Sequence, residues 1–286
     1  MDGSSPRTPP FRAQGLRGAP SFHGGIRQAR AEGGTGGWTS WRHSLRYTGV
    51  LFDLFGTLVP PFRMREHQEV MSACAAHLGI DADTCYRGWA ETFRARICGG
   101  FPSIAANLEA VARGAGRQPD PEDILRAERQ YHDFTRASLT PVEGALDTLA
   151  WLKSRGLRLG LVTNCAPDVP LLWPETAFQG YFEYCAFSCD VGMAKPEPGI
   201  YHCAIRALEL KATETLFVGD GSDRELSGAI ECGLHAVLLK ADLSNTYDAR
   251  RHDVASWHGP AINTIAGIRD ILTNEVPVQF RGATEQ

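Results

Sequence analysis

The sequence predicts an α/β protein: a doubly wound parallel sheet with an all-helical cap domain inserted after the first strand. Residues 50–52 form a continuous apolar run, which is typical of a strand that is covered on both faces. Residues 61–139 show helical periodicity alone, and regular alternation of strands and helices begins only after residue 140. These three observations together favour a layered core that is interrupted by a helical insert.

Four parts of the chain are expected. Residues 1–46 are rich in Gly, Arg and Pro, with seven arginines against two acids, and are expected to be a disordered tail or the product of an upstream start codon. A basic arm for an acidic partner is the alternative. Residues 47–60 and 140–275 would form the α/β core, residues 61–139 the helical cap, and residues 276–286 a C-terminal tail.

Individual elements follow from the apolar spacing and the turn residues. In the insert, helices are expected over residues 64–78, 83–96, 104–113 and 121–137. Further strands are predicted at residues 157–162, 184–187, 215–218 and 236–239. Between and after these strands, four helices are expected. The first starts at Thr140 with a capping box to Glu143, and the second starts after Pro198. The other two are expected over residues 223–232 and 261–272.

Composition excludes several classes of function. The net charge is −4 and no basic block is interleaved with aromatic residues, so a nucleic-acid partner is not expected. Membrane spanning is not expected either, because no apolar run approaches the length of a bilayer. Eight cysteines without a CxxC pair indicate reduced thiols and a cytoplasmic location. A small-molecule substrate remains the expected partner.

Polar residues follow three of the predicted strands, and these residues are the candidate site. Asp53, Thr163 and Asp220 each stand at a strand's carboxyl end, where open α/β sheets bind ligands. Gly56 allows a tight turn after Asp53, and Lys195 begins a later helix. A carboxylate nucleophile, a hydroxyl, a lysine and a second carboxylate would meet there, and Mg²⁺ suits such oxygen ligands together with a substrate phosphate.

The order and spacing of these residues resemble those of the haloacid dehalogenase superfamily of hydrolases, over about residues 47–275. Its four motifs are matched by DLFGTL at 53–58, LVTN at 161–164, KP at 195–196 and GDG at 219–221. The resemblance implies a Rossmann-like core with a cap between the first and second motifs. It also implies that Asp53 is a covalent nucleophile, that Thr163 orients the substrate anion and that Lys195 holds the two charges together.

Further site residues are implied in the same way. Asp53, the backbone carbonyl of Phe55, Asp220 and either Glu225 or Asp223 would bind Mg²⁺. Residues expected to contact the substrate are Phe55, Gly56 and Asn164. By its position alone, Arg63 leaves the first strand for the cap and could clamp an anion, although an arginine there is more often a solvated helix start. Glu225 has a second interpretation, because Ser222 and Glu225 have the spacing of a capping box.

Phe55 departs from the pattern of the phosphatase members, which usually carry an aspartate two residues after the nucleophile. A positioned acid/base of this kind contributes about 10²–10⁴ in rate. The dehalogenases also lack that aspartate, whereas the acids around Asp220 favour a metal site. The expected function is therefore a Mg²⁺-dependent phosphatase acting on a small phosphorylated metabolite through an aspartyl-phosphate. The alternatives are a metal-independent 2-haloacid dehalogenase and a catalytically weak ligand-binding or regulatory protein.

Overall fold

The computed structural model describes residues 47–247 and 251–273. The tails expected at residues 1–46 and 276–286 lie outside the described residues. None of the helices in the described part of the chain is long and apolar enough to cross a membrane. All eight cysteines, which lie between residues 74 and 232, are free thiols.

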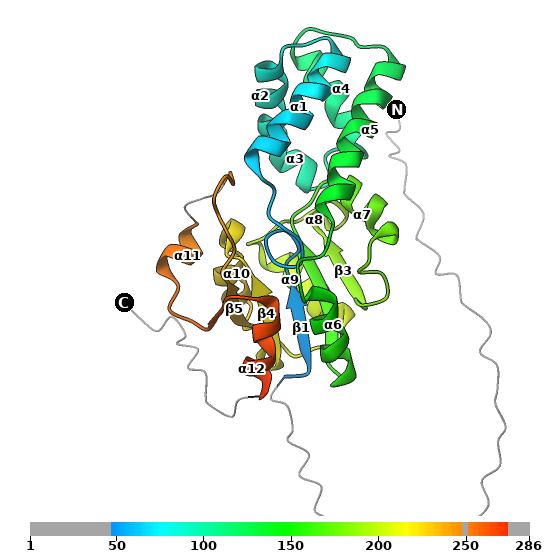
Figure 1. Ribbon diagram of the computed structural model, residues 1–286. Helices are drawn as coiled ribbons and strands as arrows, with labels where there is room; N and C mark the ends of the chain where they lie inside the picture. The colour runs from blue at the N-terminus through cyan, green and yellow to red at the C-terminus, as the bar shows by residue number, and fades with distance from the viewer. Residues whose placement is uncertain (1–46, 248–250, 274–286) are drawn as a thin grey trace, which may run out of the picture. The chain divides into compact units, whose positions relative to one another are not determined.

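A parallel sheet forms the core, as predicted, and it has six strands, one more than expected (Figure 1). Its strands, from one edge to the other, are β3 (Tyr184–Phe187), β2 (Arg158–Thr163), β1 (Gly49–Phe52), β4 (Thr215–Gly219), β5 (His235–Leu239) and β6 (Ala261–Ile262). Strand β1 pairs with β2 on one side and with β4 on the other. The three strands that carry the candidate residues are therefore neighbours.

Helices cover both faces of the sheet, which explains the continuous apolar runs of its strands. On one face, Val50 and Phe52 of β1 pack in a cluster with residues of α6 (Ala145–Ser154) and α12 (Ile268–Thr273). On the other face, Leu51 packs with residues of α9 (Pro198–Ala207) and α10 (Glu225–Glu231). Three short helices complete the core: α7 (Asp168–Leu172), α8 (Ser188–Val191) and α11 (His252–Ser256).

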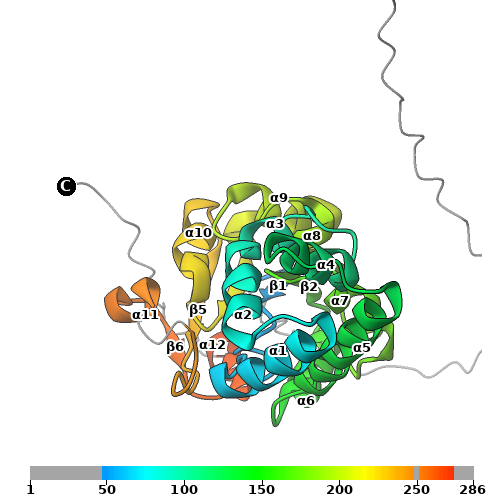
Figure 2. The same ribbon diagram turned by 90° about the horizontal axis from the view of Figure 1, so that it is seen from above.

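Between β1 and β2, five helices form an insertion with its own apolar cluster. They are α1 (Met64–Leu78), α2 (Ala82–Glu91), α3 (Phe93–Ile97), α4 (Ile104–Gly114) and α5 (Pro121–Ser138), and we call them the helical insertion. Ser103 caps α4 by accepting a hydrogen bond from the Ala106 amide at 3.1 Å. Figures 1 and 2 show the insertion beyond the ends at which β1 and β2 finish. It therefore faces the edge that carries the candidate site.

Four predicted elements differ from the structure. The helix expected over residues 223–232 begins only at Glu225, because Asp223 and Arg224 adopt positive φ values. The helix expected over residues 83–96 is divided at Thr92, whose hydroxyl donates to the carbonyls of the preceding turn. The capping box at Thr140 is wrong: its hydroxyl donates to the Ala137 carbonyl, and α6 begins only after Gly144, at φ +76°. The helix expected over residues 261–272 begins at Ile268, because residues 261–262 pair with β5 as strand β6. Short apolar runs do not distinguish strand from helix.

A segment that follows β5 reaches the helical insertion. The Asn245 carbonyl accepts a hydrogen bond from the Met64 amide at 2.7 Å. The Tyr247 hydroxyl lies 2.6 Å from His67 Nδ1 in α1. The core therefore contacts the insertion through residues about 180 positions away from it in sequence.

Candidate active site

The sheet order places three polar side chains at one edge. Asp53 follows β1 directly, and its amide donates to the Val218 carbonyl of β4 at 2.9 Å. Thr163 is the last residue of β2, and Asp220 follows β4. All three residues are buried. The expected convergence follows from the parallel order, because neighbouring parallel strands end at the same edge.

A tight turn after Asp53 fits closely against Asp220. Gly56 adopts φ +84°, and a Cβ on it would lie 1.7 Å from Asp220 Oδ2. The position therefore requires glycine for both its conformation and its space. Within the same turn, the Thr57 hydroxyl donates to Asp53 Oδ2 at 3.1 Å. This contact orients the Asp53 carboxylate and had no separate signal in the sequence.

Lys195 joins two of the buried carboxylates. Its Nζ donates hydrogen bonds to Asp53 Oδ1 and to Glu225 Oε2. Burial alone would lower the pKa of Lys195, but the charges of Asp53 and Glu225 raise it above the usual value. Burial raises the pKa of Asp53, the nearby Asp220 adds to this, and Lys195 opposes it. The ammonium is therefore held charged between two acids.

Asn164 connects the second motif to Lys195. Its Oδ1 accepts a hydrogen bond from the Lys195 amide at 2.8 Å, and its Nδ2 donates to Asp223 Oδ2 at 2.7 Å. Asp223 stands in the left-handed region at φ +51°. Through its hydrogen bond to Asn164, the Asp223 carboxylate lies outside the buried group of acids.

Glu225 is the acid that lies with Asp53. Its side chain is fully buried, and Oε1 accepts a hydrogen bond from the Gly221 amide at 2.9 Å. The capping-box interpretation placed this bond on the Ser222 amide, one residue later. Because the other oxygen, Oε2, binds Lys195, Glu225 both fastens the turn and carries charge at the site. Burial, followed by the charge of Asp53, raises the pKa of Glu225 well above its usual range.

Three buried carboxylates form a group that could hold a metal ion. One ligand oxygen from each of Asp53, Asp220 and Glu225 can be chosen so that all lie within 4.8 Å of one another. An all-oxygen donor set with two or three negative charges is the kind that Mg²⁺ prefers. Arg251 also contacts Asp220 Oδ2, and its Nη1 donates to the Asp220 carbonyl at 3.1 Å. The sequence offered no signal for Arg251, because it lies outside every motif.

Thr163, Phe55 and Arg63 occupy different environments. The Thr163 hydroxyl is buried, with no hydrogen-bond partner among the described residues. The Phe55 ring stacks on Phe62, with centroids 4.3 Å apart, and borders the cavity beside Asp53. The side chain of Arg63 is 39% exposed and pairs with Asp242 at 3.5 Å, and Arg63 is not among the residues that line the cavity. The structure thus brings together the expected residues except Arg63.

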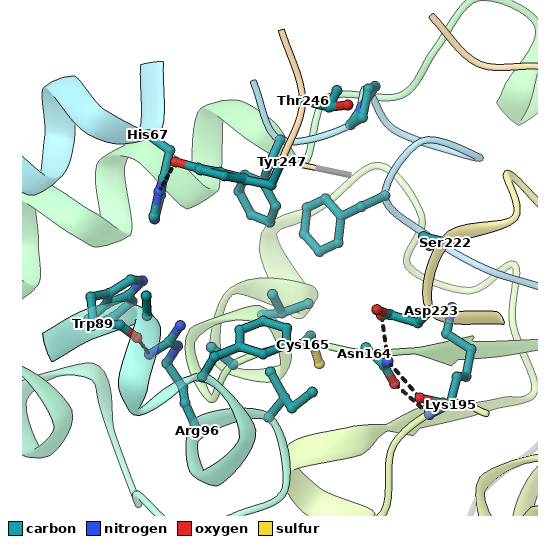
Figure 3. A pocket seen from close by; sticks show the side chains of 18 of the residues that line it. His67, Trp89, Arg96, Asn164, Cys165, Lys195, Ser222, Asp223, Thr246 and Tyr247 are labelled. Carbon is teal, nitrogen blue, oxygen red and sulfur yellow. Dashed lines mark hydrogen bonds between the residues drawn. The ribbon is translucent and has the colours of Figure 1, made fainter. Parts of the chain in front are cut away.

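A cavity of about 580 Å³ lies between the sheet edge and the helical insertion. Asp53, Asn164 and Lys195 line its core end. The insertion contributes aromatic side chains, among them Trp89 and Tyr131, together with the buried Arg96. Figure 3 shows Trp89 and Arg96 across the cavity from Asn164 and Lys195. The residues of the insertion carry ordinary helical packing patterns, so the sequence did not distinguish them as cavity residues.

Comparisons with known proteins identify the family of the chain. Residues 47–233 match the family model described as haloacid dehalogenase-like hydrolase. The chain is 26% identical over 212 residues to a glyceraldehyde 3-phosphate phosphatase of Methanopyrus kandleri, covering 71% of this chain and 88% of the relative. It is also 26% identical over 241 residues to a ribulose-1,5-bisphosphate 5-phosphatase of Halopiger xanaduensis, covering 79% and 99%.

Among solved structures, the L-2-haloacid dehalogenase of Xanthobacter autotrophicus, with chloropropionic acid covalently bound, has the same fold. The TM-score is 0.52 at 17% identity, covering 80% of this chain and 99% of that one. The family model spans well over half of the chain, and it contains the strand ends that carry Asp53, Thr163 and Asp220. The resemblance inferred from the four motifs is therefore confirmed: the chain belongs to the haloacid dehalogenase-like hydrolases.

Proposed function

We propose that the protein is a Mg²⁺-dependent phosphatase that acts on a small phosphorylated metabolite through an aspartyl-phosphate at Asp53. The observation that carries this proposal is the buried group of Asp53, Asp220 and Glu225, which offers oxygen ligands beside the nucleophile. Relatives named as sugar-phosphate phosphatases support the same reaction. A 2-haloacid substrate would need no such group of acids.

In this proposal Asp53 attacks phosphorus, and the bond to the leaving oxygen breaks as the bond to the carboxylate forms. Lys195 holds the carboxylate of Asp53 in place and places positive charge near the incoming phosphoryl group. The Thr163 hydroxyl, which has no partner within the part of the chain that the structure describes, is available to donate to a phosphoryl oxygen. Asp53, Asp220, Glu225 and the Phe55 carbonyl would hold Mg²⁺, which supplies further positive charge against the phosphoryl oxygens.

Phe55 sets the leaving groups that this site can expel. At its position a phosphatase would use an aspartate to protonate the departing oxygen, and a phenyl ring cannot do so. A simple alkoxide therefore leaves slowly, whereas an acyl, enol or aryl oxygen leaves without a proton. We propose substrates with such activated phosphates, or an acid/base supplied by water within the cavity.

The test is phosphate release from a panel of phosphate esters, with Mg²⁺ and after treatment with EDTA. Activity is expected to require Mg²⁺ and to be lost in Asp53→Asn. The matched control is Asp147→Asn, an exposed aspartate on α6, which should retain activity. Phosphate release that persists in EDTA or in Asp53→Asn would contradict the proposal.

A second candidate function is metal-independent C–halogen hydrolysis through an ester at Asp53. Phe55 favours it, because a halide needs no proton to leave. The charges of the site also favour it, because the basic side chains of Lys195 and Arg251 contact all three buried carboxylates. Halide release from 2-chloropropionate that EDTA leaves unchanged would support this candidate. Saturable binding without turnover in either assay would instead favour a ligand-binding protein.

A further inference from the structure

Three lysine and arginine side chains of the described residues line the cavity, and they differ in their partners. At the core end, Lys195 and Arg251 are ion-paired with the buried carboxylates. Arg96 lies at the opposite end, on α3 of the helical insertion (Figure 3). Its hydrogen bonds go to neutral acceptors, and no ion pair among the described residues involves Arg96. The cations at the core end are therefore opposed by carboxylates, whereas Arg96 at the other end is not ion-paired with any carboxylate of the described residues.

Arg96 is buried, with 4% of its surface exposed. Its Nη1 donates to three neutral acceptors, which include the Trp89 carbonyl and Asn107 Oδ1, both at 2.9 Å. The guanidinium carbon lies 3.8 Å from the centre of the Trp89 ring. These contacts fix the side chain, while Nε and Nη2 have no acceptor among the described residues. A buried charge is normally paired, so a fixed guanidinium with free donors indicates a counter-ion from outside the chain.

Two titratable neighbours do not supply that counter-ion. Burial, and secondly the charge of Arg96, lower the pKa of His67 to about 4, so His67 is neutral at pH 7. Asp168 also lines the cavity, but its Oδ2 accepts from Thr135, and burial raises its pKa. Its Oδ1 has no partner within the described part of the chain. Asp168 therefore moderates the charge of Arg96 without binding it.

We infer that Arg96 binds a second anionic group of the substrate, a carboxylate or a phosphate, at the end remote from the group that Asp53 attacks. This inference rests on the proposed function. The volume of about 580 Å³ is ample for a molecule with two charged ends. Trp89 and Tyr131 line the wall near Arg96, and their rings suit an apolar or planar spacer. The substrate class is thus a phosphate ester or anhydride with an apolar body and a distal anion.

Paired aryl phosphates test the inference. One member, 4-carboxyphenyl phosphate, carries a distal carboxylate, and 4-carbamoylphenyl phosphate carries a neutral group of the same shape. The longer 4-(2-carboxyethyl)phenyl phosphate and its amide cover a second spacing, and 1,4-phenylene bisphosphate tests a distal phosphate. Wild-type kcat/KM is expected to favour the anionic member by about 10- to 100-fold, the range expected for a charge-assisted hydrogen bond.

Substitutions at Arg96 separate recognition from intrinsic reactivity. In Arg96→Gln the kcat/KM ratio of the anionic ester to the neutral ester should fall at least tenfold. Comparing this ratio between wild type and variant cancels the difference in chemical reactivity between the two esters. Arg96→Lys keeps the charge without the planar fork and should retain part of the preference. Arg113→Gln removes an exposed arginine of α4 and should keep the whole of it. A preference that is equal in wild type and Arg96→Gln overturns the inference.

Binding of inert analogues distinguishes failure of the inference from failure of the proposed function. Calorimetry would compare 4-carboxybenzylphosphonate with its amide in wild type and Arg96→Gln. If no ester is hydrolysed but the acid binds in an Arg96-dependent manner, the inference stands and the phosphatase proposal fails. If both esters are hydrolysed without preference and both analogues bind equally, the phosphatase proposal stands and the inference fails.

Discussion

His67 makes the stability of this protein depend on pH. It lies on α1 with 8% of its surface exposed, and its Nδ1 is 2.6 Å from the Tyr247 hydroxyl. Burial, with the charge of Arg96 as a second cause, lowers its pKa from 6.5 to about 4. The folded protein therefore resists protonation of a group that the unfolded chain protonates readily.

The magnitude follows from these two pKa values. A tenfold change in a protonation equilibrium is worth about 1.4 kcal/mol, so the difference between 6.5 and about 4 corresponds to about 3 kcal/mol. Because the folded pKa is the lower one, this stability is fully present above pH 6.5 and is lost as pH falls through about 4. A loss of this size is a large part of the stability of an ordinary domain, about 5–15 kcal/mol.

Urea unfolding of wild type and His67→Gln between pH 7.5 and 4 measures this loss. Glutamine does not titrate and still offers a hydrogen bond to Tyr247, so the variant should lose about 2–3 kcal/mol less than wild type over this range. Arg96→Gln should raise the pKa of His67, although burial should keep it below 6.5. Equal losses in wild type and His67→Gln, or an NMR titration of His67 near pH 6.5, would refute the reasoning.

Three further substitutions probe the site itself. Phe55→Asp should raise the ratio of alkyl phosphate turnover to aryl phosphate turnover by about 10²–10⁴. Phe55→Asn is the control, because asparagine cannot donate the proton. An unchanged ratio in Phe55→Asp would exclude position 55 as the site of the missing acid. Gly56→Ala should destabilise the fold by more than about 1–2 kcal/mol in urea unfolding and should weaken Mg²⁺ binding, because the added Cβ collides with Asp220. Wild-type values for both the unfolding free energy and Mg²⁺ affinity would contradict the requirement for glycine. Lys195→Met should abolish phosphate release and lower unfolding free energy by about 3–5 kcal/mol, because two buried carboxylates lose their cation; retained stability would show that these acids are protonated.

Local pattern was sufficient for much of the fold. The residues of β1 are apolar without alternation because both faces of the strand are covered, and this is visible in the run itself. Helix α1 was predicted with its observed bounds, Met64–Leu78, because Gly79 in the left-handed region ends it. The two-residue strand β6 was missed, because its apolar residues also fit the spacing of the helix that follows.

Within the candidate site, the sequence could place those residues that stand at strand ends, while their roles remain predictions. Asp53, Thr163 and Asp220 were identified because strand polarity puts all carboxyl ends of a parallel sheet at one edge. Arg63 was expected in the site because it follows the first strand closely, yet in the structure it pairs with Asp242. Nearness in sequence to a motif does not fix the direction of a long side chain.

Sequence patterns were enough to predict the parallel sheet, the helical insert and the acids at the sheet edge, because each depends on short-range periodicity and on chain direction. The folded chain was needed to show that Glu225, not Asp223, joins Asp53 through Lys195, because a left-handed turn directs Asp223 to Asn164. It was also needed to show that Arg96 faces the cavity with no acidic partner among the described residues. Both outcomes depend on segments distant in sequence, and no local pattern records the balance of charge between such segments.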